Sequence, residues 1–354
     1  MKYRLGELFC GPGGIASGAL SAEATDGKES HGFTHAWASD YHRQTCDTYI
    51  RNICPDSPDT VHCEDVRQLD ISKLGEVEGF AYGFPCNDFS IVGESKGFEG
   101  EFGPLYSYGL PILERFNPLF FLAENVSGLG NSSQKLAFEQ ILKDLKEAGS
   151  GYRITPHMHK AEEYGVPQSR HRIIVVGIRS DLGQSFKVPK PIISDGNYIT
   201  ARMALEDKPI PATAANNELT RQSPVVVERL KHIKPGQNAW TADLPDELKL
   251  NVKGARLSQI YKRLDPDRPS YTVTGSGGGG THGYHWQEPR ALTNRERARL
   301  QSFDDTFVFE GSKESVRRQI GMAVPPVLAH HIFEAILYTL HDIPYDNIPA
   351  NLEE

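Results

Sequence analysis

The sequence is poor in cysteine, and its cysteines form no paired motif. There are five, an odd number, and no two are spaced as Cys-x-x-Cys. That argues against a disulfide framework and against a cysteine zinc site. Long apolar runs are missing as well: none approaches the ~20 residues that a membrane-spanning helix needs, and the first residues lack the apolar stretch of a signal peptide. These absences predict a soluble, cytoplasmic protein with no membrane partner.

Composition excludes further classes of protein. Hydrophobic residues make up 38% and charged residues 24% of the 354 residues, which argues against collagen-like, coiled-coil and disordered chains. At ~100 to 200 residues per domain, this length predicts two domains or one large domain with an insertion. The net charge of −8 counts against a nucleic-acid partner, yet residues 220–300 hold 14 Lys and Arg against 8 Asp and Glu. Charge alone favours a solvated surface there; a polyanion-binding surface is the alternative.

Short apolar runs alternate with helical patterns in the first half of the chain, which is typical of βαβ units around a parallel sheet. The patterns predict strands at 5–9, 35–39, 60–63, 80–84, 119–123 and 173–178, and helices at 41–51, 136–148, 294–301 and 326–340. From about residue 188, prolines and a glycine run interrupt the periodicity. We therefore expect an α/β fold with a doubly wound, mostly parallel sheet and a second, smaller, irregular domain. The expected divisions are 1–187, 188–290, and 291–354, the last returning to the first domain.

Three of the predicted strands end in residues suited to an adenosine group. The first runs into the glycine-rich turn 10–14, and Asp40 and Asp65 follow the second and third. The turn lacks the spacing of a phosphate loop and of Gly-x-Gly-x-x-Gly, which disfavours a nicotinamide oxidoreductase. Because open α/β sheets bind ligands at the carboxyl ends of their strands, the three features together predict an adenosine-type site. The glycine turn by itself is equally compatible with a mere tight turn.

Groups able to do chemistry follow the later strands. Cys86 follows the fourth strand, Glu124 and Asn125 end the fifth, and Arg170 and Arg172 precede the sixth. If the sixth strand extends over both arginines, alternation places them on one face, able to hold a phosphate or a carbonyl oxygen. Taken singly, a core thiol, a surface acid and a structural salt bridge are the commoner interpretations. The histidine pairs 157/159, 282/285 and 330/331 lack acid or thiol partners at metal spacing, so we assign no metal.

Together these residues resemble the DNA (cytosine-5) methyltransferase family of bacterial type. The matching blocks span nearly the whole chain in the family's order. They are Phe9-Cys10-Gly11-Pro12-Gly13-Gly14, Asp40, Asp65, Gly83-Phe84-Pro85-Cys86 with Phe89-Ser90, Glu124-Asn125-Val126, Gln168-Ser169-Arg170-His171-Arg172, 295–303 and Gly321-Met322-Ala323-Val324-Pro325-Pro326. The resemblance implies a Rossmann-like class I methyltransferase fold that depends on S-adenosylmethionine. It also implies that 188–290 is the target recognition domain.

The resemblance further implies a reaction. A methyl group passes from S-adenosylmethionine, leaving S-adenosylhomocysteine, to carbon 5 of a cytosine flipped out of a short specific sequence in double-stranded DNA. The Cys86 thiolate adds to carbon 6, Glu124 holds the ring nitrogen and amine, and Arg172 contacts the ring carbonyl. Arg170 and Asn125 complete the implied catalytic set. The implied donor-binding residues are Phe9, Cys10, Gly11, Pro12, Gly13, Gly14, Asp40, Tyr41, Asp65, Val66, Gly83, Pro85, Leu105, Ala323 and Val324, and the DNA-binding residues are Ser90 and Thr272.

Two positions depart from the family's pattern. Asn87 stands where the family usually has Gln, and Met322 where it usually has Asn, which puts the closing-loop geometry and the donor affinity in doubt. Two other functions stay open: a tRNA-type RNA cytosine-5 methyltransferase, and a catalytically silent DNA-binding homologue. All the catalytic blocks lie on one chain, so a monomer is adequate for catalysis. Any cognate restriction endonuclease would act as a separate partner. No metal is expected.

Overall fold

The computed structural model describes residues 1–84, 103–126, 135–194, 196–251 and 257–352. Pro85, Cys86, Asn87 and Ser90 therefore lie outside the described residues. The chain divides into two compact units. The first unit comprises Met1–Ala161, His171–Ile192 and Pro326–Glu354, and the second unit comprises Glu162–Arg170 and Ile193–Pro325.

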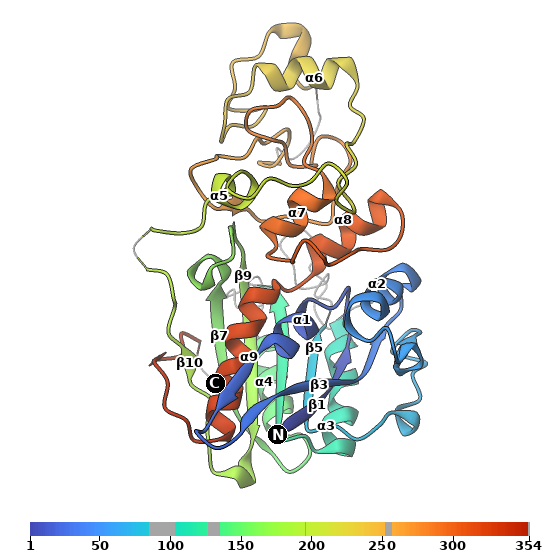
Figure 1. Ribbon diagram of the computed structural model, residues 1–354, viewed down its shortest axis with the longest axis vertical. Helices are drawn as coiled ribbons and strands as arrows, with labels where there is room; N and C mark the ends of the chain where they lie inside the picture. Colours follow the sequence, from blue (N-terminus) through green and yellow to red (C-terminus); the bar gives the residue numbers. More distant parts are fainter. Residues whose placement is uncertain (85–102, 127–134, 195, 252–256, 353–354) are drawn as a thin grey trace. The chain divides into compact units, whose positions relative to one another are not determined.

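Within the described residues, the first unit is built on an eight-stranded sheet in the order β2-β3-β1-β5-β6-β9-β7, with β4 paired to β3 (Figure 1). The strands are β1 Lys2–Leu8, β2 Glu23–Thr25, β3 Ser30–Asp40, β4 Val61–Cys63, β5 Gly79–Gly83, β6 Phe120–Val126, β7 Tyr152–Lys160 and β9 His171–Arg179. The pairings β1–β3, β1–β5, β3–β4 and β5–β6 are parallel, while β2–β3, β6–β9 and β7–β9 are antiparallel. A short pair, β10 Val188–Pro189 and β12 Asn347–Ile348, lies apart from this sheet.

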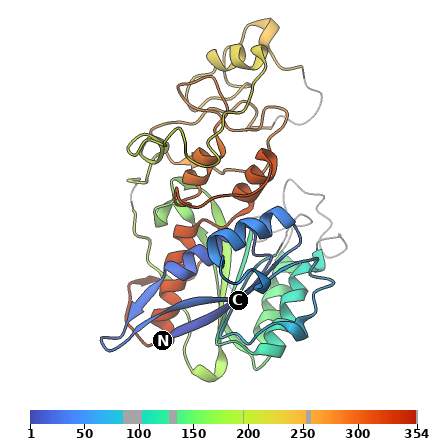
Figure 2. The same cartoon turned by 45° about the vertical axis from the view of Figure 1, so that its right-hand side comes forward.

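Helices cover both faces of the sheet, so the predicted doubly wound α/β class is confirmed (Figure 2). One face carries α1 Gly14–Ser21, α2 Arg43–Ile53 and α9 Pro326–Leu340, and the other carries α3 Leu110–Phe116 and α4 Lys135–Glu147. Successive residues of β3 show the alternation, because Trp37 packs in the core with α3 and α4 whereas Ala38 packs with Tyr49 of α2. Helices α1 and α9 approach so closely that a Cβ at Gly18 would lie 2.4 Å from that of Ala329.

The stretch Lys313–Leu340 is long and apolar enough to cross a membrane by length and composition, but 67% of its apolar window is buried inside the protein. It is also two helices. Ala323 is extended at the end of α8 Lys313–Met322, and α9 begins at Pro326. This stretch therefore has the features of core packing.

The second unit has little regular structure. Among its described residues are α5 Ala201–Leu205, α6 Pro224–Lys231, α7 Asn294–Leu300 and α8, and the two-residue strands β8 Gln168–Ser169 and β11 Ser270–Tyr271. Among the residues that the structure describes in both units, the short 3₁₀ helices are η1 Pro58–Thr60, η2 Ile71–Lys73, η5 Gly103–Gly109, η8 Ala161–Tyr164, η9 Ser180–Leu182 and η10 Asp246–Leu248. A buried arginine substitutes for missing strand hydrogen bonds: Arg263 donates to the carbonyls of Leu230, Ile233 and His285.

The structure divides the chain differently from the expected boundaries. Residues 291–325 belong to the second unit, because the fully buried Arg295 donates to the carbonyls of Ala215, Asp304 and Phe307. Residues 162–170 belong there too, since the Gln168 amide donates to the Leu300 carbonyl. The chain returns to the first unit at Pro326, and the earlier crossing falls after Ile192.

Candidate active site

A glycine turn joins β1 to α1 at the carboxyl end of the sheet. Phe9, Gly11 and Gly13 have φ of 52°, 54° and 99°. A Cβ on Gly13 would lie 2.9 Å from Ile53 Cγ1 and 3.2 Å from the Tyr49 ring. Gly13 is therefore required both by its left-handed backbone and by its close packing. A Cβ at Gly11 would meet nothing within 4 Å, so there is open space beside the turn for a ligand to approach the main chain.

Asp40 braces this turn from the end of β3. Its Oδ2 accepts the Gly11 N–H at 3.1 Å, and its Oδ1 accepts the His42 N–H at 3.0 Å. The Cys10 N–H is held in turn by the Ser39 carbonyl at 3.0 Å. The structure thus brings Asp40 and the glycine turn together, as the sequence predicted. The contact between Asp40 and a ribose stays a prediction.

Asp65 follows β4 and pairs with a neighbour. The Arg67 guanidinium donates to Oδ1 at 2.9 Å and also to Oδ2, and these hydrogen bonds lower the pKa of the Asp65 carboxyl. Asp65 is therefore an ionised acceptor with one cation already beside it. The other residues predicted around the donor show a range of exposures: Tyr41 is largely exposed, Val66 half-buried and Leu105 buried.

Beneath the turn lies a buried acid that the sequence analysis missed. Glu7, on β1, accepts a hydrogen bond from the Tyr49 hydroxyl at 2.6 Å, and burial raises its pKa to about 8. Burial also raises the pKa of the Cys10 thiol well above its ordinary value, so Cys10 is a packing residue rather than a nucleophile. The available signal was a single acidic residue inside the otherwise apolar run 5–9, which was predicted to be a strand.

The centre of the candidate site is an ion pair between β6 and β9. Arg172 Nε donates to Glu124 Oε1 at 2.9 Å, and the two side chains are only 13% and 11% exposed. Burial lowers the pKa of Arg172, an effect that Glu124 opposes, and a guanidinium stays protonated in proteins. Gly83 is the register partner of Glu124 on β5, and a Cβ there would lie 3.1 Å from Glu124 Oε2. Glycine at 83 thus leaves room around the carboxylate.

Asn125 anchors the strand that leads to the predicted nucleophile. Its Nδ2 donates to the Phe84 carbonyl at 3.2 Å, while its Oδ1 accepts the Val126 N–H at 2.7 Å. The side chain is 3% exposed. Because Phe84 stands two residues before Cys86, Asn125 holds the last described point of the chain on the nucleophile's side. The catalytic role implied for Asn125 stays a prediction.

The two predicted arginines, Arg170 and Arg172, belong to different units of the chain. Arg170, 1% exposed and in the second unit, donates to the carbonyls of Val273 at 3.3 Å and of Gly321 and Ala323 at 3.0 Å each. The expectation that both arginines share one strand face is wrong, because β9 begins at His171 and Arg170 precedes it. Arg170 ties segments of the second unit together, whereas Arg172 belongs to the site.

Other predicted residues lie in the second unit. Thr272 Oγ1 donates to the Ser169 carbonyl at 2.8 Å, so this hydroxyl has a partner within the protein. Ala323 and Val324 are buried, and Met322 is 64% exposed at the end of α8. The assignments of Thr272 to DNA, and of Ala323 and Val324 to the donor, stay predictions.

Fold and site together define a class I methyltransferase: a doubly wound sheet whose carboxyl edge carries a glycine turn, a braced carboxylate and a buried acid–arginine pair. Among solved structures, a prophage-encoded E. coli protein named as a DNA modification methyltransferase matches with a TM-score of 0.72 at 23% identity, over 95% of this chain and 99% of that one. At that identity the likeness shows the fold.

Sequence comparison identifies the family. The model of C-5 cytosine-specific DNA methylases matches residues 3–338, and the chain belongs to this family of DNA (cytosine-5-)-methyltransferases. Type II methyltransferase M.BbvI of Brevibacillus brevis is 59% identical over 98% of this chain and 94% of its own length. Type II methyltransferase M.NgoFVII of Neisseria gonorrhoeae is 38% identical over 96% of this chain and 88% of its own length.

Proposed function

We propose that this protein methylates carbon 5 of one cytosine within a short specific sequence of double-stranded DNA, as the modification enzyme of a restriction-modification system or as a solitary bacterial methylase. The observation that carries the proposal is the buried Glu124–Arg172 pair beside the strand end that leads to Cys86. Two relatives that match nearly the whole chain are named Type II methyltransferases, which supports the modification role.

An aromatic carbon is a poor nucleophile, so the reaction needs transient activation. The Cys86 thiolate adds to carbon 6 of the cytosine, and the ring electrons thereby become available at carbon 5. Carbon 5 then takes the methyl group, a base removes the carbon 5 proton, and the electron pair of that bond re-forms the double bond as the thiolate leaves. The cytosine must leave the base stack for this chemistry, because carbon 6 is not accessible within the duplex.

Glu124 and Arg172 recognise and activate the base. Glu124 faces the ring nitrogen and the exocyclic amine, and a proton held between Glu124 and that nitrogen stabilises the adduct. Arg172 donates to the ring carbonyl oxygen. In the free protein the two side chains neutralise each other at 2.9 Å, which lowers the penalty of keeping both charges buried before the base arrives.

The donor site fits the edge built by β1, β3 and β4. S-adenosylmethionine supplies an electrophilic methyl group when bound. The glycine turn lets the donor approach the main chain, Phe9 offers a ring face, and Asp40 accepts from the ribose while it holds the turn. Asp65 accepts from the adenine amine. Both carboxylates already accept hydrogen bonds from the protein, so they are oriented before the donor binds.

We assign DNA recognition to the second unit. Its irregular backbone holds most of the basic stretch 220–300, which supplies charge for phosphate contacts, and loops rather than regular elements present its side chains. Ser90 and Thr272 are the proposed backbone contacts. If the protein serves a restriction-modification system, a cognate endonuclease would act as a separate partner.

The test uses wild type and Cys86→Ser expressed in a host that lacks cytosine methylation, with its DNA sequenced for 5-methylcytosine at base resolution. We expect methylation at one short motif with wild type and none with the variant. An unmethylated genome in the presence of folded wild type would overturn the proposal. Methyl transfer to tRNA but not to duplex DNA would move the assignment to RNA.

A further inference from the structure

A cluster of three potential metal ligands lies in the first unit, outside the methylation machinery. Asp26 follows β2, His31 lies at the start of β3, and His341 follows α9; one ligand atom of each lies within 4.8 Å of the others. Because His31 and Asp40 occupy opposite ends of β3, about 30 Å of strand separates this cluster from the donor site at ~3.3 Å per residue.

His31 is the feature that needs an explanation. Its side chain is 3% exposed, and neither Nδ1 nor Nε2 makes a hydrogen bond among the described residues. A buried polar group without a hydrogen bond costs about 1–3 kcal/mol, and an ion or water that completes the site is one of the few ways to recover that energy. Its polar contact is an ion pair of poor geometry, Nε2 to Asp26 Oδ2 at 3.4 Å.

The other two ligands are already oriented. Asp26 Oδ1 accepts the N–H groups of Lys28 at 2.8 Å and Glu29 at 2.9 Å, which leaves Oδ2 directed to His31. His341 Nε2 and the Tyr3 hydroxyl lie 2.9 Å apart. When Nε2 carries the hydrogen and donates it to Tyr3, Nδ1 keeps its lone pair for a metal, and Tyr3 acts as the outer partner that metal-binding imidazoles commonly have.

We propose that Asp26, His31 and His341 form a structural site for a divalent transition metal, with zinc as the ion that two imidazoles and one carboxylate suit best. The proposal is independent of the methylation chemistry. The histidine pairs considered in the sequence analysis are close neighbours along the chain. His31 and His341, by contrast, are separated by about 310 residues, and only folding brings them together.

Zinc binding requires a small local rearrangement. The rings of His31 and His341 stack with centroids 3.5 Å apart and planes at 15°, so the nitrogen lone pairs of the two rings lie in nearly parallel planes and do not converge on one point. At metal–ligand distances of about 2.0–2.2 Å, one ring must turn to bring both nitrogens to one ion.

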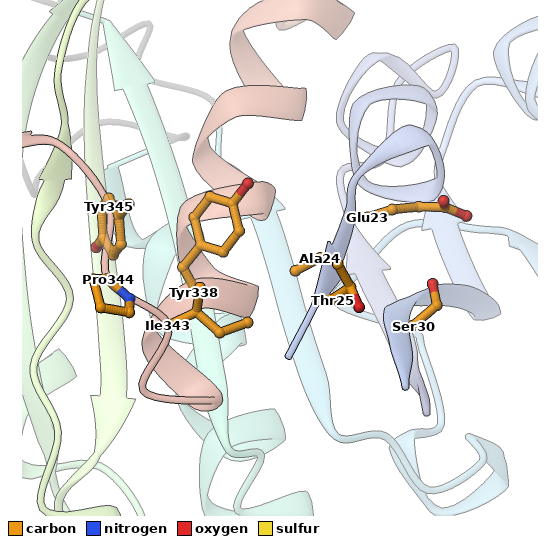
Figure 3. A pocket seen from close by; sticks show the side chains of 8 residues that line it. All are labelled: Glu23, Ala24, Thr25, Ser30, Tyr338, Ile343, Pro344 and Tyr345. Carbon is orange, nitrogen blue, oxygen red and sulfur yellow. The ribbon is translucent and has the colours of Figure 1, made fainter. Parts of the chain in front are cut away.

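A cavity lies close to the cluster, although none of the three ligands lines it. It has a volume of about 540 Å³ and lies between the β2–β3 hairpin and the end of α9 (Figure 3). Its lining includes Thr25 and Ser30, the chain neighbours of Asp26 and His31, and Tyr338 and Ile343, which flank His341 in the sequence. A bound ion would therefore join the hairpin to the C-terminal end of α9.

The experiment titrates chelator-treated, full-length protein with zinc by calorimetry and records the melting temperature with and without the metal. We expect one zinc per chain and a rise in melting temperature, with no response to magnesium, which prefers oxygen ligands. His31→Gln and His341→Gln should each weaken zinc binding at least about tenfold, and Tyr3→Phe by a smaller factor. Methyl transfer should stay within about twofold of wild type in these variants.

The matched control is His330→Gln, on α9 in a second group of potential ligands with His331 and Glu334. This variant should bind zinc as wild type does. Circular dichroism of each metal-free variant checks that it is folded. The proposal is overturned if wild type binds no zinc, if both His31→Gln and His341→Gln bind it undiminished, or if His330→Gln alone abolishes binding.

Discussion

Two arginines one residue apart, Arg170 and Arg172, serve two regions of the molecule. Arg172 lies in the first unit and meets a carboxylate, while Arg170 lies in the second unit and meets three main-chain carbonyls. The terminal nitrogens of Arg170 donate to carbonyls and so hold segments of the second unit together. Arg172 is paired with a largely buried carboxylate, and under the proposed mechanism it exchanges that partner for the cytosine. Two arginines of one motif, separated only by His171, thus have different partners, and we expect chemistry to depend on Arg172 and assembly on Arg170.

The largest expected effect follows from the loss of the Glu124 carboxyl. Glu124→Gln keeps a similar shape and an acceptor for Arg172 but cannot relay a proton to the cytosine ring. We expect single-turnover methylation to fall by about a hundredfold or more, with the melting temperature little changed.

The control for Glu124→Gln is Glu78→Gln, which removes a carboxylate from the partly exposed Arg4–Glu78 ion pair. Glu78 directly precedes β5, at the end of that strand opposite to Gly83, the register partner of Glu124. It should leave methylation within about twofold of wild type. Equal losses in both variants would contradict a special role for Glu124.

The next largest effects are expected from replacement of Arg172 and Arg170 by lysine. Arg172→Lys should lower kcat by about ten- to a hundredfold without a large change in melting temperature, because an ammonium cannot reproduce the planar fork. Arg170→Lys should lower the melting temperature markedly, since hydrogen bonds to charged groups contribute about 1.5–3 kcal/mol each. Its turnover per folded molecule should stay within a few-fold of wild type. The reverse pattern would contradict the division between chemistry and assembly.

A smaller effect is expected at Asn125. Asn125→Leu removes the hydrogen bond that holds the Phe84 carbonyl, so the segment bearing Cys86 loses its anchor. We expect about a tenfold slower methylation step with donor binding unchanged, measured by single-turnover kinetics and by calorimetry with S-adenosylhomocysteine. Weakened donor binding at an unchanged rate would place Asn125 in the donor site instead.

The smallest effect concerns stability and pH at Glu7. The pKa of Glu7 in the folded protein, about 8, lies above the ordinary value of 4.5. Between about pH 4.5 and pH 8, the folded state therefore keeps a proton on Glu7 that the unfolded state has released. Stability contributed by this group is complete below about pH 4.5 and is lost as pH rises to about 8, with a slope of up to about 1.4 kcal/mol per pH unit. Glu7→Gln should flatten denaturant-measured stability across that window. An unchanged slope would contradict the assignment.

The sequence predicted the parts of the fold that local pattern determines. The apolar runs located β1, β4, β5 and β6, and the glycine turn, Asp40 and Glu124 lie where strand ends placed them. Strand β7 was missed because Pro156, His157 and His159 interrupt its apolar pattern, and β2 because it has three residues. Contacts remote in the chain were beyond prediction. Nothing local shows that the chain changes units between Arg170 and His171, or that Arg295 ties 291–325 to the second unit.

The most direct test of the central claim is covalent trapping on duplex DNA in which 5-fluorocytosine replaces every cytosine, with S-adenosylmethionine present. Fluorine at carbon 5 cannot leave as a proton, so an adduct through Cys86 cannot resolve. We expect a denaturant-resistant complex with wild type, none with Cys86→Ser, about hundredfold slower formation with Glu124→Gln, and near-normal formation with folded Arg170→Lys. Absence of a complex with wild type, or equally fast trapping by Glu124→Gln, would contradict it.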